Sequence, residues 1–350
     1  MISSQGYAAK QAKARIEPFR FERRDPLPND IVIAIEYCGI CHSDVHQVNE
    51  DWFPGIFPMV PGHEIVGRVT HAGAGVKKFK AGDLAGVGVL VDSCRKCESC
   101  RAGLEQYCEV GNIQTYNARD KKGDPTFGGY SNNIVVDEAY ALKIPANLNL
   151  AATAPLLCAG ITTYAPLRHW KAGKHSKVGV VGLGGLGHMG LKFAHALGAH
   201  VVQFTTSAKK KEDALKLGAN EVVLSNDAAA MQAQTASFDI ILDTVSADHD
   251  LNAYINLLKR DGVHVLLGVP DRPAAVSAMN LIMKRRSLAG SAVGGVGEVQ
   301  EMLDFCSQHN IVSDVEIVQP NQINEAYKRL LGNDVKYRFV IELGRANQQS

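Results

Sequence analysis

Residues 177–187 constrain the fold of this chain more than any other segment. The apolar run 177–181 leads directly into Gly182, Leu183, Gly184, Gly185, Leu186 and Gly187, and a helical pattern follows from about His188. Glycines in this arrangement let the backbone approach a pyrophosphate, whose charge lies at the N-terminus of the next helix. The segment therefore predicts the start of a dinucleotide-binding unit, with a glycine turn that binds no cofactor as the alternative.

The two halves of the chain differ in their pattern of predicted strands and helices. Residues 1–150 carry short β-branched runs broken by Gly, Pro, Asn and Asp, which predict a mainly β domain. From residue 151 onward, strand and helix patterns alternate, which is typical of a doubly wound parallel sheet. A chain of 350 residues exceeds the length that one hydrophobic core usually serves, so we predict two domains in an α/β protein.

The segment after the second strand of the nucleotide-binding half indicates the type of cofactor. An NAD enzyme normally carries an acidic residue about 20 residues past the glycine motif. This chain instead has Thr205, Thr206 and Ser207, followed by Lys209–Lys211. Hydroxyl and ammonium groups bind a 2′-phosphate, which a carboxylate would repel, so NADP is favoured. The lysines fit equally well as a solvated first turn of the next helix.

Charge and hydropathy exclude several classes of partner. The chain has 37 Lys and Arg against 36 Asp and Glu, which gives no electrostatic argument for nucleic acid or for an anionic membrane. The N-terminus has no uninterrupted apolar segment, and no run approaches the roughly 20 apolar residues that span a bilayer. We expect a cytoplasmic protein that acts on a small molecule, with no nucleic-acid or membrane partner.

Eight cysteines in such a protein favour metal ligation over disulfides, because cytosolic thiols are kept reduced. Cys94, Cys97, Cys100 and Cys108 lie within one short segment and can enclose a single tetrahedral ion. Zinc with four thiolates is the usual structural arrangement, and an iron–sulfur cluster is the competing interpretation. The closed site would hold a long loop in place, with Arg95, Lys96 and Arg101 compensating its negative charge.

The segment Cys38-Gly-Ile-Cys41-His42 has three interpretations. It matches a haem c attachment pattern, and it contains a redox-type pair of cysteines. Alternatively, Cys41 is a zinc ligand with distant partners, for which His63 in the segment VPGHEIVGRV is a candidate. A lone histidine beside a strand is more often structural, and spacing alone does not join Cys41, His63 and Cys158 into one site.

Several motifs together point to a known family. They are CGICHSDVH, PGHEIVGRV, GDLAGVG, the four-cysteine loop, PLLCAGITTY, VGLGGLGHMG, TTSAKKK and DVKYRFVIEL, and they extend essentially from end to end. The chain resembles the zinc-containing medium-chain alcohol dehydrogenases, in the cinnamyl alcohol dehydrogenase branch and close to its bacterial NADP-dependent broad-range aldehyde reductases. The resemblance implies a GroES-like catalytic domain over residues 1–150, completed by 291–350, and a Rossmann NADP-binding domain over 151–290.

The resemblance also implies two zinc ions, one structural on the four cysteines and one catalytic on Cys41, His63 and Cys158. Zinc with two thiolates and a neutral imidazole is formally neutral, and three ligands leave a fourth position for water or an aldehyde oxygen. Glu64 is implied as an alternative fourth ligand, which we expect to be transient because it would fill that position. Cys38 and Cys306 are left as buried thiols.

The remaining site residues are likewise implied by the resemblance. Ser43 would pass a proton through the nicotinamide ribose to His46, although His46 also fits as an exposed loop histidine. Asp44 is expected to orient a metal ligand. The cofactor residues are the loop Gly182–Gly187, then Thr206, Ser207 and Lys211 for the 2′-phosphate, and Thr244, Gly268 and Ser291 near the nicotinamide. Trp52 and Leu157 resemble residues of the substrate pocket, with the protein core as their alternative place.

The implied function is hydride transfer between NADP(H) and a primary alcohol or aldehyde, with aromatic and aliphatic aldehydes reduced by NADPH in a homodimer. A zinc polyol or amino-alcohol dehydrogenase using NAD is a rival, but it calls for an acidic residue where Thr206 stands. A second rival is an NADPH-binding sensor without activity, which a lost zinc ligand or relay residue would support. Zinc-free quinone reductases of the same superfamily lack both metal sets.

Overall fold

The computed structural model describes residues 1–270 and 272–344, and the chain forms two compact units. Unit 1 contains Met1–Ile161 and the chain from Gly294 onward, and unit 2 contains Thr162–Val293. The sequence placed the divisions after residues 150 and 290. Residues 151–161 lie with unit 1 because α3 (Leu150–Thr153) and η3 (Ala154–Leu157) pack against the central strands of its main sheet.

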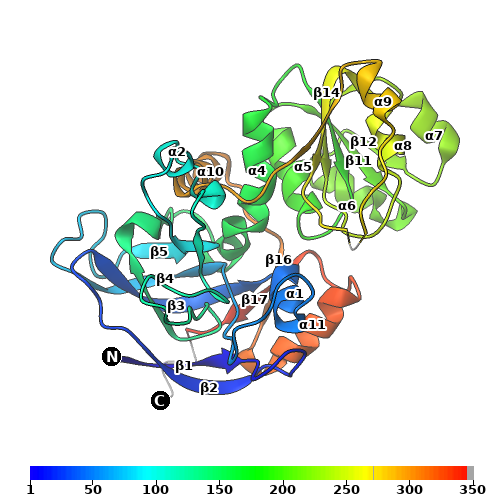
Figure 1. Ribbon diagram of the computed structural model, residues 1–350. Coiled ribbons are helices and arrows are strands. Elements are labelled where there is room, and N and C mark those ends of the chain that lie inside the picture. The colour runs from blue at the N-terminus through cyan, green and yellow to red at the C-terminus, as the bar shows by residue number, and fades with distance from the viewer. Residues whose placement is uncertain (271, 345–350) are drawn as a thin grey trace. The chain divides into compact units, whose positions relative to one another are not determined.

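Unit 2 is built on a six-stranded parallel sheet, which confirms the predicted doubly wound architecture (Figure 1). In spatial order its strands are β12 (Glu221–Leu224), β11 (His200–Thr205), β10 (Lys177–Val181), β13 (Phe238–Asp243), β14 (Leu258–Leu266) and β15 (Ser287–Gly290). The earliest of these six strands along the chain, β10, lies in the middle of the sheet, so the strand order reverses beside it. Ligands of such sheets bind outside the carboxyl ends of the strands at this reversal.

Helices connect these strands, as parallel pairing requires. They are α5 (Gly187–Ala196), η4 (Ala208–Lys210), α6 (Lys211–Lys216), α7 (Ala228–Ala233), α8 (Leu251–Ile255) and α9 (Ala278–Ile282), and α4 (Ala159–His169) precedes β10. Because helices cover the sheet, its strands are buried on both faces and read as continuous apolar runs. Phe204, Phe238 and Tyr254 pack ring against ring in this core.

Unit 1 is mainly β, as the sequence predicted, with a seven-stranded sheet centred on β3 (Asp30–Ile40). The order is β16 (Val315–Val318), β17 (Arg338–Glu342), β3, β4 (Ile65–Ala72), β5 (Leu84–Val87) and β9 (Leu142–Lys143), and β8 (Asn133–Asp137) also pairs with β3. Strand β17, from the far end of the chain, runs antiparallel to β3. The C-terminal segment therefore completes the sheet that the N-terminal segment begins.

Smaller elements surround this sheet. The strands are β1 (Ile2–Ala8) with β2 (Glu17–Arg23), and β6 (Leu90–Asp92) with β7 (Ile113–Gln114). The helices are α1 (His42–Asn49), α2 (Glu98–Arg101), η1 (Glu105–Tyr107), η2 (Glu138–Tyr140), α10 (Val296–His309), η5 (Pro320–Gln322) and α11 (Ile323–Leu331). Helix α1 follows β3 after one residue, Cys41, so the end of the central strand fixes where α1 begins.

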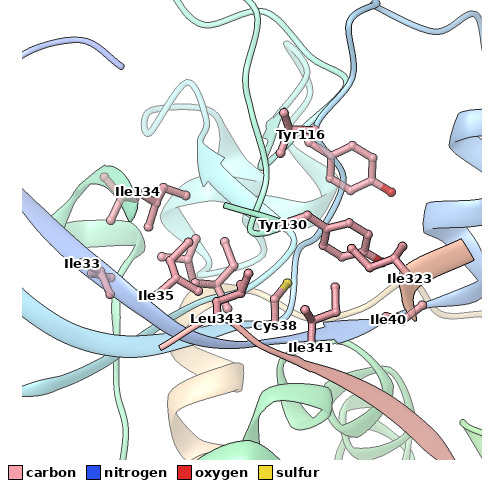
Figure 2. Packing of buried hydrophobic residues seen from close by; sticks show 14 of the residues in the cluster. Ile33, Ile35, Cys38, Ile40, Tyr116, Tyr130, Ile134, Ile323, Ile341 and Leu343 are labelled. Atoms are coloured by element: carbon pink, nitrogen blue, oxygen red, sulfur yellow. The ribbon is translucent and has the colours of Figure 1, made fainter. Parts of the chain in front are cut away.

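The core of unit 1 gathers on β3. Ile33, Ile35, Cys38 and Ile40 are fully buried there, and Figure 2 shows them packed with Tyr130 and with residues of the C-terminal segment. Cys38 lies inside this apolar cluster, and Cys306 is buried in α10. Both thiols occupy the interior, as expected from the sequence.

Within residues 1–270 and 272–344, no single helix is long and apolar enough to cross a membrane. One bent pair, Leu150–Leu157 with Ala159–His169, meets the criteria of length and composition only when its two parts are taken together.

A buried ionic cluster holds the loop that follows β13. His249 Nε2 lies 2.7 Å from Asp243 Oδ2, and its Nδ1 lies 2.8 Å from the carbonyl oxygen of Ala247. Both partners can only accept hydrogen bonds, so both ring nitrogens carry protons and the ring is an imidazolium. The hydrogen bond to Asp243 raises the pKa of His249 above its ordinary value. Buried His264 donates to the same Asp243 oxygen from Nε2 at 3.0 Å.

This cluster predicts a pH-dependent contribution to stability. The pKa of His249 is raised in the folded state, so the stabilisation is complete below the ordinary histidine pKa of about 6.5 and is lost as pH rises through the folded-state pKa. A His249→Gln variant lacks the titrating ring. The difference in melting temperature between wild type and variant should therefore shrink from pH 6 to pH 9, whereas a constant difference would contradict a charged His249.

Candidate active site and metal centres

Four side chains from three segments that are distant in sequence meet at the start of α1. Cys41, His63, Glu64 and Cys158 each offer one ligand atom, and these atoms lie within 4.8 Å of one another. We call these residues the mixed set. Cys41 is the N-cap of α1, His63 and Glu64 precede β4, and Cys158 follows η3. His63, Glu64 and Cys158 are buried, so the set forms an interior site whose donors are two sulfurs, an imidazole and a carboxylate.

The distance between the two sulfurs fits a bound metal ion. Cys41 Sγ and Cys158 Sγ lie 3.9 Å apart. Two thiolates on one tetrahedral zinc, each at about 2.3 Å, would stand about 3.8 Å apart, whereas a disulfide brings its sulfurs to about 2.05 Å. All eight cysteines lie in the described residues, and none of them forms a disulfide. The mixed set therefore has the donor types and the sulfur spacing of a zinc site.

The carboxylate of Asp44 organises this set. Its Oδ2 accepts from the backbone N–H of Cys41 at 2.9 Å and from the Tyr130 hydroxyl at 3.0 Å. Its Oδ1 accepts from the backbone N–H of Gly62 at 3.2 Å and lies 3.3 Å from His63 Nδ1. The hydrogen bond from the Cys41 N–H to Asp44 is half of a capping box. One buried carboxylate therefore both caps the N-terminus of α1 and orients the His63 ring. With Nδ1 engaged, Nε2 of His63 is the nitrogen left for a metal.

Glu64 belongs to the mixed set and also contacts a buried arginine, Arg338. Its Oε1 forms a buried ion pair with Arg338 of β17, while its Oε2 is buried without a hydrogen-bond partner in the described structure. Burial raises the pKa of Glu64 to about 7, although Arg338 opposes this shift. A Cβ at Gly39 would lie 1.8 Å from Oε2, so the glycine makes room for the carboxylate. Because Glu64 Oε2 has no hydrogen-bond partner among the described residues, it is available to bind a metal ion at the mixed set.

The four-cysteine set is a second metal site, between β6 and β7. Ligand atoms of Cys94, Cys97, Cys100 and Cys108 lie within 4.8 Å of one another, and the sulfurs of Cys94 and Cys100 are 3.9 Å apart. Backbone N–H groups point at three of the sulfurs, at 3.3–3.5 Å. Backbone hydrogen bonds lower the pKa of Cys94 and Cys108. The segment is therefore shaped to hold thiolates around one ion.

One detail of the expected charge compensation is wrong. The guanidinium of Arg95 pairs with Asp92 and Asp137, at 2.8 Å in each case, and does not compensate the thiolates. The backbone N–H groups take this role in its place.

The two expected relay residues lie on one face of α1. Ser43 and His46 are three residues apart, which places them on neighbouring turns. Ser43 Oγ is 3.5 Å from His63 Nε2, at the mixed set. His46 Nδ1 is 2.9 Å from Asp51 Oδ2, and its ring stacks on Trp52 with centroids 4.5 Å apart. Because a carboxylate only accepts, the His46 proton lies on Nδ1, and Nε2 is the position at which a proton can be exchanged.

The glycine loop of unit 2 has the shape of a phosphate cradle. It connects β10 to α5, and Gly182 has a φ of +88°, which favours glycine. A Cβ at Gly187 would lie 2.1 Å from the Gly182 carbonyl oxygen, whereas a Cβ at Gly184 would meet nothing within 4 Å. The two ends of the loop therefore pack tightly against each other, and its middle, at Gly184, leaves open space. This arrangement fits the pyrophosphate of a dinucleotide.

The other expected cofactor residues lie at the same edge of the sheet. Thr206 and Ser207 follow β11, Thr244 follows β13, Gly268 comes shortly after β14, and Ser291 follows β15. The carboxyl ends of parallel strands meet at one edge, so residues spread over more than 80 positions converge there. Thr244 Oγ1 donates to the carbonyl of Val181, which ties this edge to the start of the glycine loop.

The two residues predicted for the substrate pocket, Trp52 and Leu157, differ in their exposure. Trp52 is 36% exposed and covers the His46 ring. Leu157 is 1% exposed and packs beside Gly86 and Gly88, so its side chain belongs to the core.

Sequence reasoning missed several residues of these sites. Arg338 stands in an apolar closing strand, and its isolation there was a usable signal for a buried ion pair. Lys210, rather than Lys211, contacts the glycine loop, because its Nζ donates to the Leu183 carbonyl at 2.9 Å. Tyr130 lies 86 residues from Asp44, and no local pattern marked it.

We predict that Asp44→Asn weakens metal binding at the mixed set alone. The amide keeps the shape of the carboxylate but replaces one acceptor oxygen by an NH₂ donor, which faces other donors. Loss of a group that orients a metal-ligating histidine typically costs 10–100-fold in metal affinity. Metal analysis after mild dialysis against a chelator should find about one zinc per chain in the variant, against two in wild type. Equal retention in both proteins would contradict the organising role of Asp44.

Comparison with known proteins supplies the family. Residues 27–146 match the model of the alcohol dehydrogenase GroES-like domain, and residues 185–308 match that of the zinc-binding dehydrogenases. The chain is 57% identical over 338 residues to aldehyde reductase YahK of Escherichia coli, covering 95% of this chain and 96% of that protein. It is 52% identical to NADP-dependent alcohol dehydrogenase C 1 of Mycolicibacterium smegmatis, covering 98% of each.

Solved structures agree with this relationship. A cinnamyl alcohol dehydrogenase from Sorghum bicolor superposes with a TM-score of 0.94 at 44% identity, covering 97% of this chain and 98% of the other. A cinnamyl alcohol dehydrogenase from Helicobacter pylori, solved with NADP(H), gives a TM-score of 0.92 at 41% identity and covers 98% of both chains. The chain therefore belongs to the zinc-containing medium-chain alcohol dehydrogenases, in their cinnamyl alcohol dehydrogenase branch, and is an NADP(H)-dependent zinc alcohol dehydrogenase and aldehyde reductase.

Proposed function

We propose that this enzyme reduces a broad range of aromatic and aliphatic aldehydes with NADPH, and that the mixed set is its catalytic centre. The observation that carries the proposal is the meeting of Cys41, His63 and Cys158 beside Ser43 on α1. These three residues would hold the catalytic zinc, with Glu64 as its alternative ligand. A zinc ion there supplies Lewis-acid polarisation of the aldehyde oxygen, and NADPH supplies the hydride.

The side chains of α1 would deliver the proton that the product oxygen takes up. Ser43 carries a proton at Oγ and lies next to the mixed set. His46, one turn further along α1, has Nε2 as the position at which a proton can be exchanged, because its Nδ1–H is engaged by Asp51. Trp52 stacks on the ring and limits its rotation. Asp51 and Trp52 would thus keep His46 in the orientation that proton transfer needs.

The cofactor would be held by the carboxyl edge of the unit 2 sheet. We assign the pyrophosphate to Gly182, Leu183, Gly184, Gly185, Leu186 and Gly187, the 2′-phosphate to Thr206, Ser207 and Lys211, and the nicotinamide half to Thr244, Gly268 and Ser291. Lys210 supports this assignment, because its bond to the Leu183 carbonyl places a second ammonium group between the loop and the end of β11. Hydroxyl and ammonium groups suit a phosphate, as the sequence indicated.

The breadth of substrates follows from what surrounds the site. Trp52, partly exposed beside His46, offers an aromatic face to one side of the substrate. Such a face binds aromatic and aliphatic groups alike, because its contribution is mainly apolar area. Leu157, which is buried, would act only by shaping the backbone beside Cys158.

A homodimer in the cytoplasm completes the proposal. Strand β15 is the edge of the six-stranded sheet, and Met279, Ile282 and Met283 of the neighbouring helical segment are each at least 60% exposed. An unpaired edge beside exposed apolar side chains favours association of two copies, which the native mass of the purified protein tests. Eight cysteines without a disulfide, six of them in the mixed set and the four-cysteine set, suit a reducing compartment.

The central experiment measures NADPH consumption at neutral pH with a panel of aromatic and aliphatic aldehydes. The wild type should turn over both classes and prefer NADPH to NADH. Cys158→Ser should lower turnover by more than about 10²-fold while leaving NADPH binding intact, because the cofactor residues lie on other segments. Cys306→Ala, which alters a buried thiol outside both sets, is the control and should stay active. Metal-replete wild type that binds NADPH without turnover would favour a sensor.

Cofactor preference has its own test in Thr206→Asp. A carboxylate at the end of β11 would repel the 2′-phosphate of NADPH and accept from the ribose hydroxyls of NADH. We expect the KM for NADPH to rise about tenfold or more, equivalent to about 1.4 kcal/mol, and the KM for NADH to fall. Thr206→Asn, which is similar in size but uncharged, should change the preference far less. An unchanged preference in Thr206→Asp would place the 2′-phosphate elsewhere.

A further inference from the structure

Ser93 immediately precedes Cys94, the first residue of the four-cysteine set, and is almost fully buried, with 1% of its surface exposed. Its hydroxyl oxygen has three neighbours. The Tyr140 hydroxyl lies at 2.6 Å, Cys100 Sγ at 3.1 Å and the backbone nitrogen of Arg95 at 3.2 Å. Ser93 therefore joins one metal-binding sulfur to a tyrosine of η2, 47 residues away in sequence.

The direction of each hydrogen bond follows from the chemistry of the partners. A serine hydroxyl has one proton to donate and two lone pairs to accept. The Arg95 backbone N–H can only donate, and a metal-bound Cys100 is a thiolate that can only accept. Ser93 must therefore donate to Cys100, and it accepts from Arg95 N–H and from the Tyr140 hydroxyl. Every donor and acceptor position of Ser93 is then occupied, in a chain that runs from Tyr140 through Ser93 to Cys100.

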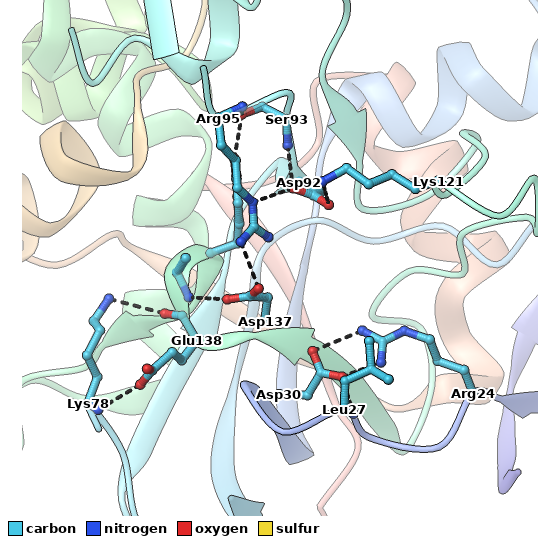
Figure 3. Close-up of polar contacts among 12 residues, drawn as sticks. Arg24, Leu27, Asp30, Lys78, Asp92, Ser93, Arg95, Lys121, Asp137 and Glu138 are labelled. Carbon is cyan, nitrogen blue, oxygen red and sulfur yellow. Dashed lines mark hydrogen bonds and ion pairs between the residues drawn. The ribbon is translucent and has the colours of Figure 1, made fainter. Parts of the chain in front are cut away.

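Charged groups hold Arg95, which lies against Tyr140, and Figure 3 shows the ion pairs of Arg95 with Asp92 and Asp137. Arg95 has a positive φ of 62°, and its guanidinium lies 5.1 Å from the centre of the Tyr140 ring. The same guanidinium pairs with Asp92 and with Asp137, and Lys121 pairs with the other oxygen of Asp92 at 2.6 Å.

Asp137 in turn begins η2. Its Oδ1 accepts from the Ala139 backbone, while Oδ2 accepts from Arg95. The turn that presents the Tyr140 hydroxyl is thus tied to the segment that carries the cysteines.

We propose that Ser93 and Tyr140 are positioning residues for the structural zinc, with Tyr140 acting on the Cys100 thiolate through Ser93. The inference rests on the assignment of zinc to the four-cysteine set. The hydrogen bond from Ser93 stabilises and orients the Cys100 thiolate. The hydrogen-bond chain from Tyr140 to Cys100 therefore slows the loss of zinc. Ser93 and Tyr140 thereby stabilise the metal-bound form of the whole segment between β6 and β7.

The first test measures zinc release from the purified holoenzyme into a chromogenic chelator, with Ser93→Ala, Tyr140→Phe and the double variant. Either single change should speed release of one of the two zinc ions about 10-fold or more, the usual range for groups that orient metal ligands. Because Tyr140 acts through Ser93, Tyr140→Phe should add little to Ser93→Ala. Ser93→Thr keeps the hydroxyl and should behave like wild type. Tyr7→Phe, in β1, is the matched control for loss of a phenolic hydroxyl.

A spectroscopic measurement separates this role from general packing. Cobalt bound at the four-cysteine set has a sulfur-to-metal charge-transfer band that reports electron donation by the thiolates. The band should shift in Ser93→Ala and Tyr140→Phe but not in Ser93→Thr or Tyr7→Phe. An unshifted band with wild-type zinc release would overturn the proposal. So would fully additive effects of the two changes, because Tyr140 would then act by packing alone.

The outcomes also distinguish this inference from the function on which it rests. If wild type carries zinc at the mixed set only, the assignment of the four-cysteine set fails and the inference fails with it. If both sites hold zinc and the variants release it at the wild-type rate, the inference alone is wrong. Should Ser93→Ala fail to fold, Tyr140→Phe still decides between the two results, because it removes only a hydroxyl and nearly retains the side-chain volume.

Discussion

The catalytic half of this enzyme depends on one buried carboxylate. Asp44 receives the Cys41 N–H, the Gly62 N–H, the Tyr130 hydroxyl and the proton on His63 Nδ1. These donors come from the start of α1, the segment before β4 and the segment before β8, so Asp44 joins parts of the chain that would otherwise be positioned separately. A buried carboxylate is stable only when its oxygens are well satisfied, and three of these four donors belong to a residue of the mixed set or to its chain neighbour. The same contacts that keep the charge in the interior thus shape the metal site.

The two units divide the chemistry between them. Unit 1 carries both metal sets and the proton-carrying side chains of α1, while unit 2 carries the glycine loop and the edge expected to bind the 2′-phosphate. Each site uses the end of a strand. In unit 1, β3 runs directly into Cys41 and α1, and in unit 2 the carboxyl ends of parallel strands present the cofactor residues. The four-cysteine set has no open position for a substrate, and its place is to order the long connection between β6 and β7.

The sequence predicted the features whose determinants are local. The glycine loop, the four-cysteine spacing and the alternation of strands and helices are each readable within a few dozen residues, and all three appear in the structure. Cys41, His63 and Cys158 could be joined only through the family resemblance, because tertiary contacts across 117 positions leave no periodic signal. Tyr130 and Ser93 were missed because tyrosine and serine are common residue types whose roles arise only from the partners that folding provides. Arg338 was missed although its place in an apolar strand marked it. The expected compensation by Arg95 failed because two aspartates, one 42 residues away, bind its guanidinium.

The central claim is that this chain holds two zinc ions in different ligand sets, one of four sulfurs and one of two sulfurs with nitrogen and oxygen. X-ray absorption at the zinc edge of the purified enzyme measures this directly. With two zinc ions per chain, the account predicts an average of about three sulfurs at about 2.3 Å and one nitrogen or oxygen at about 2.0–2.1 Å around each zinc. An average of four sulfurs would mean that Cys41, His63 and Cys158 do not bind zinc together, and a single zinc per chain would mean that one of the two sets binds none. Either result would contradict the account.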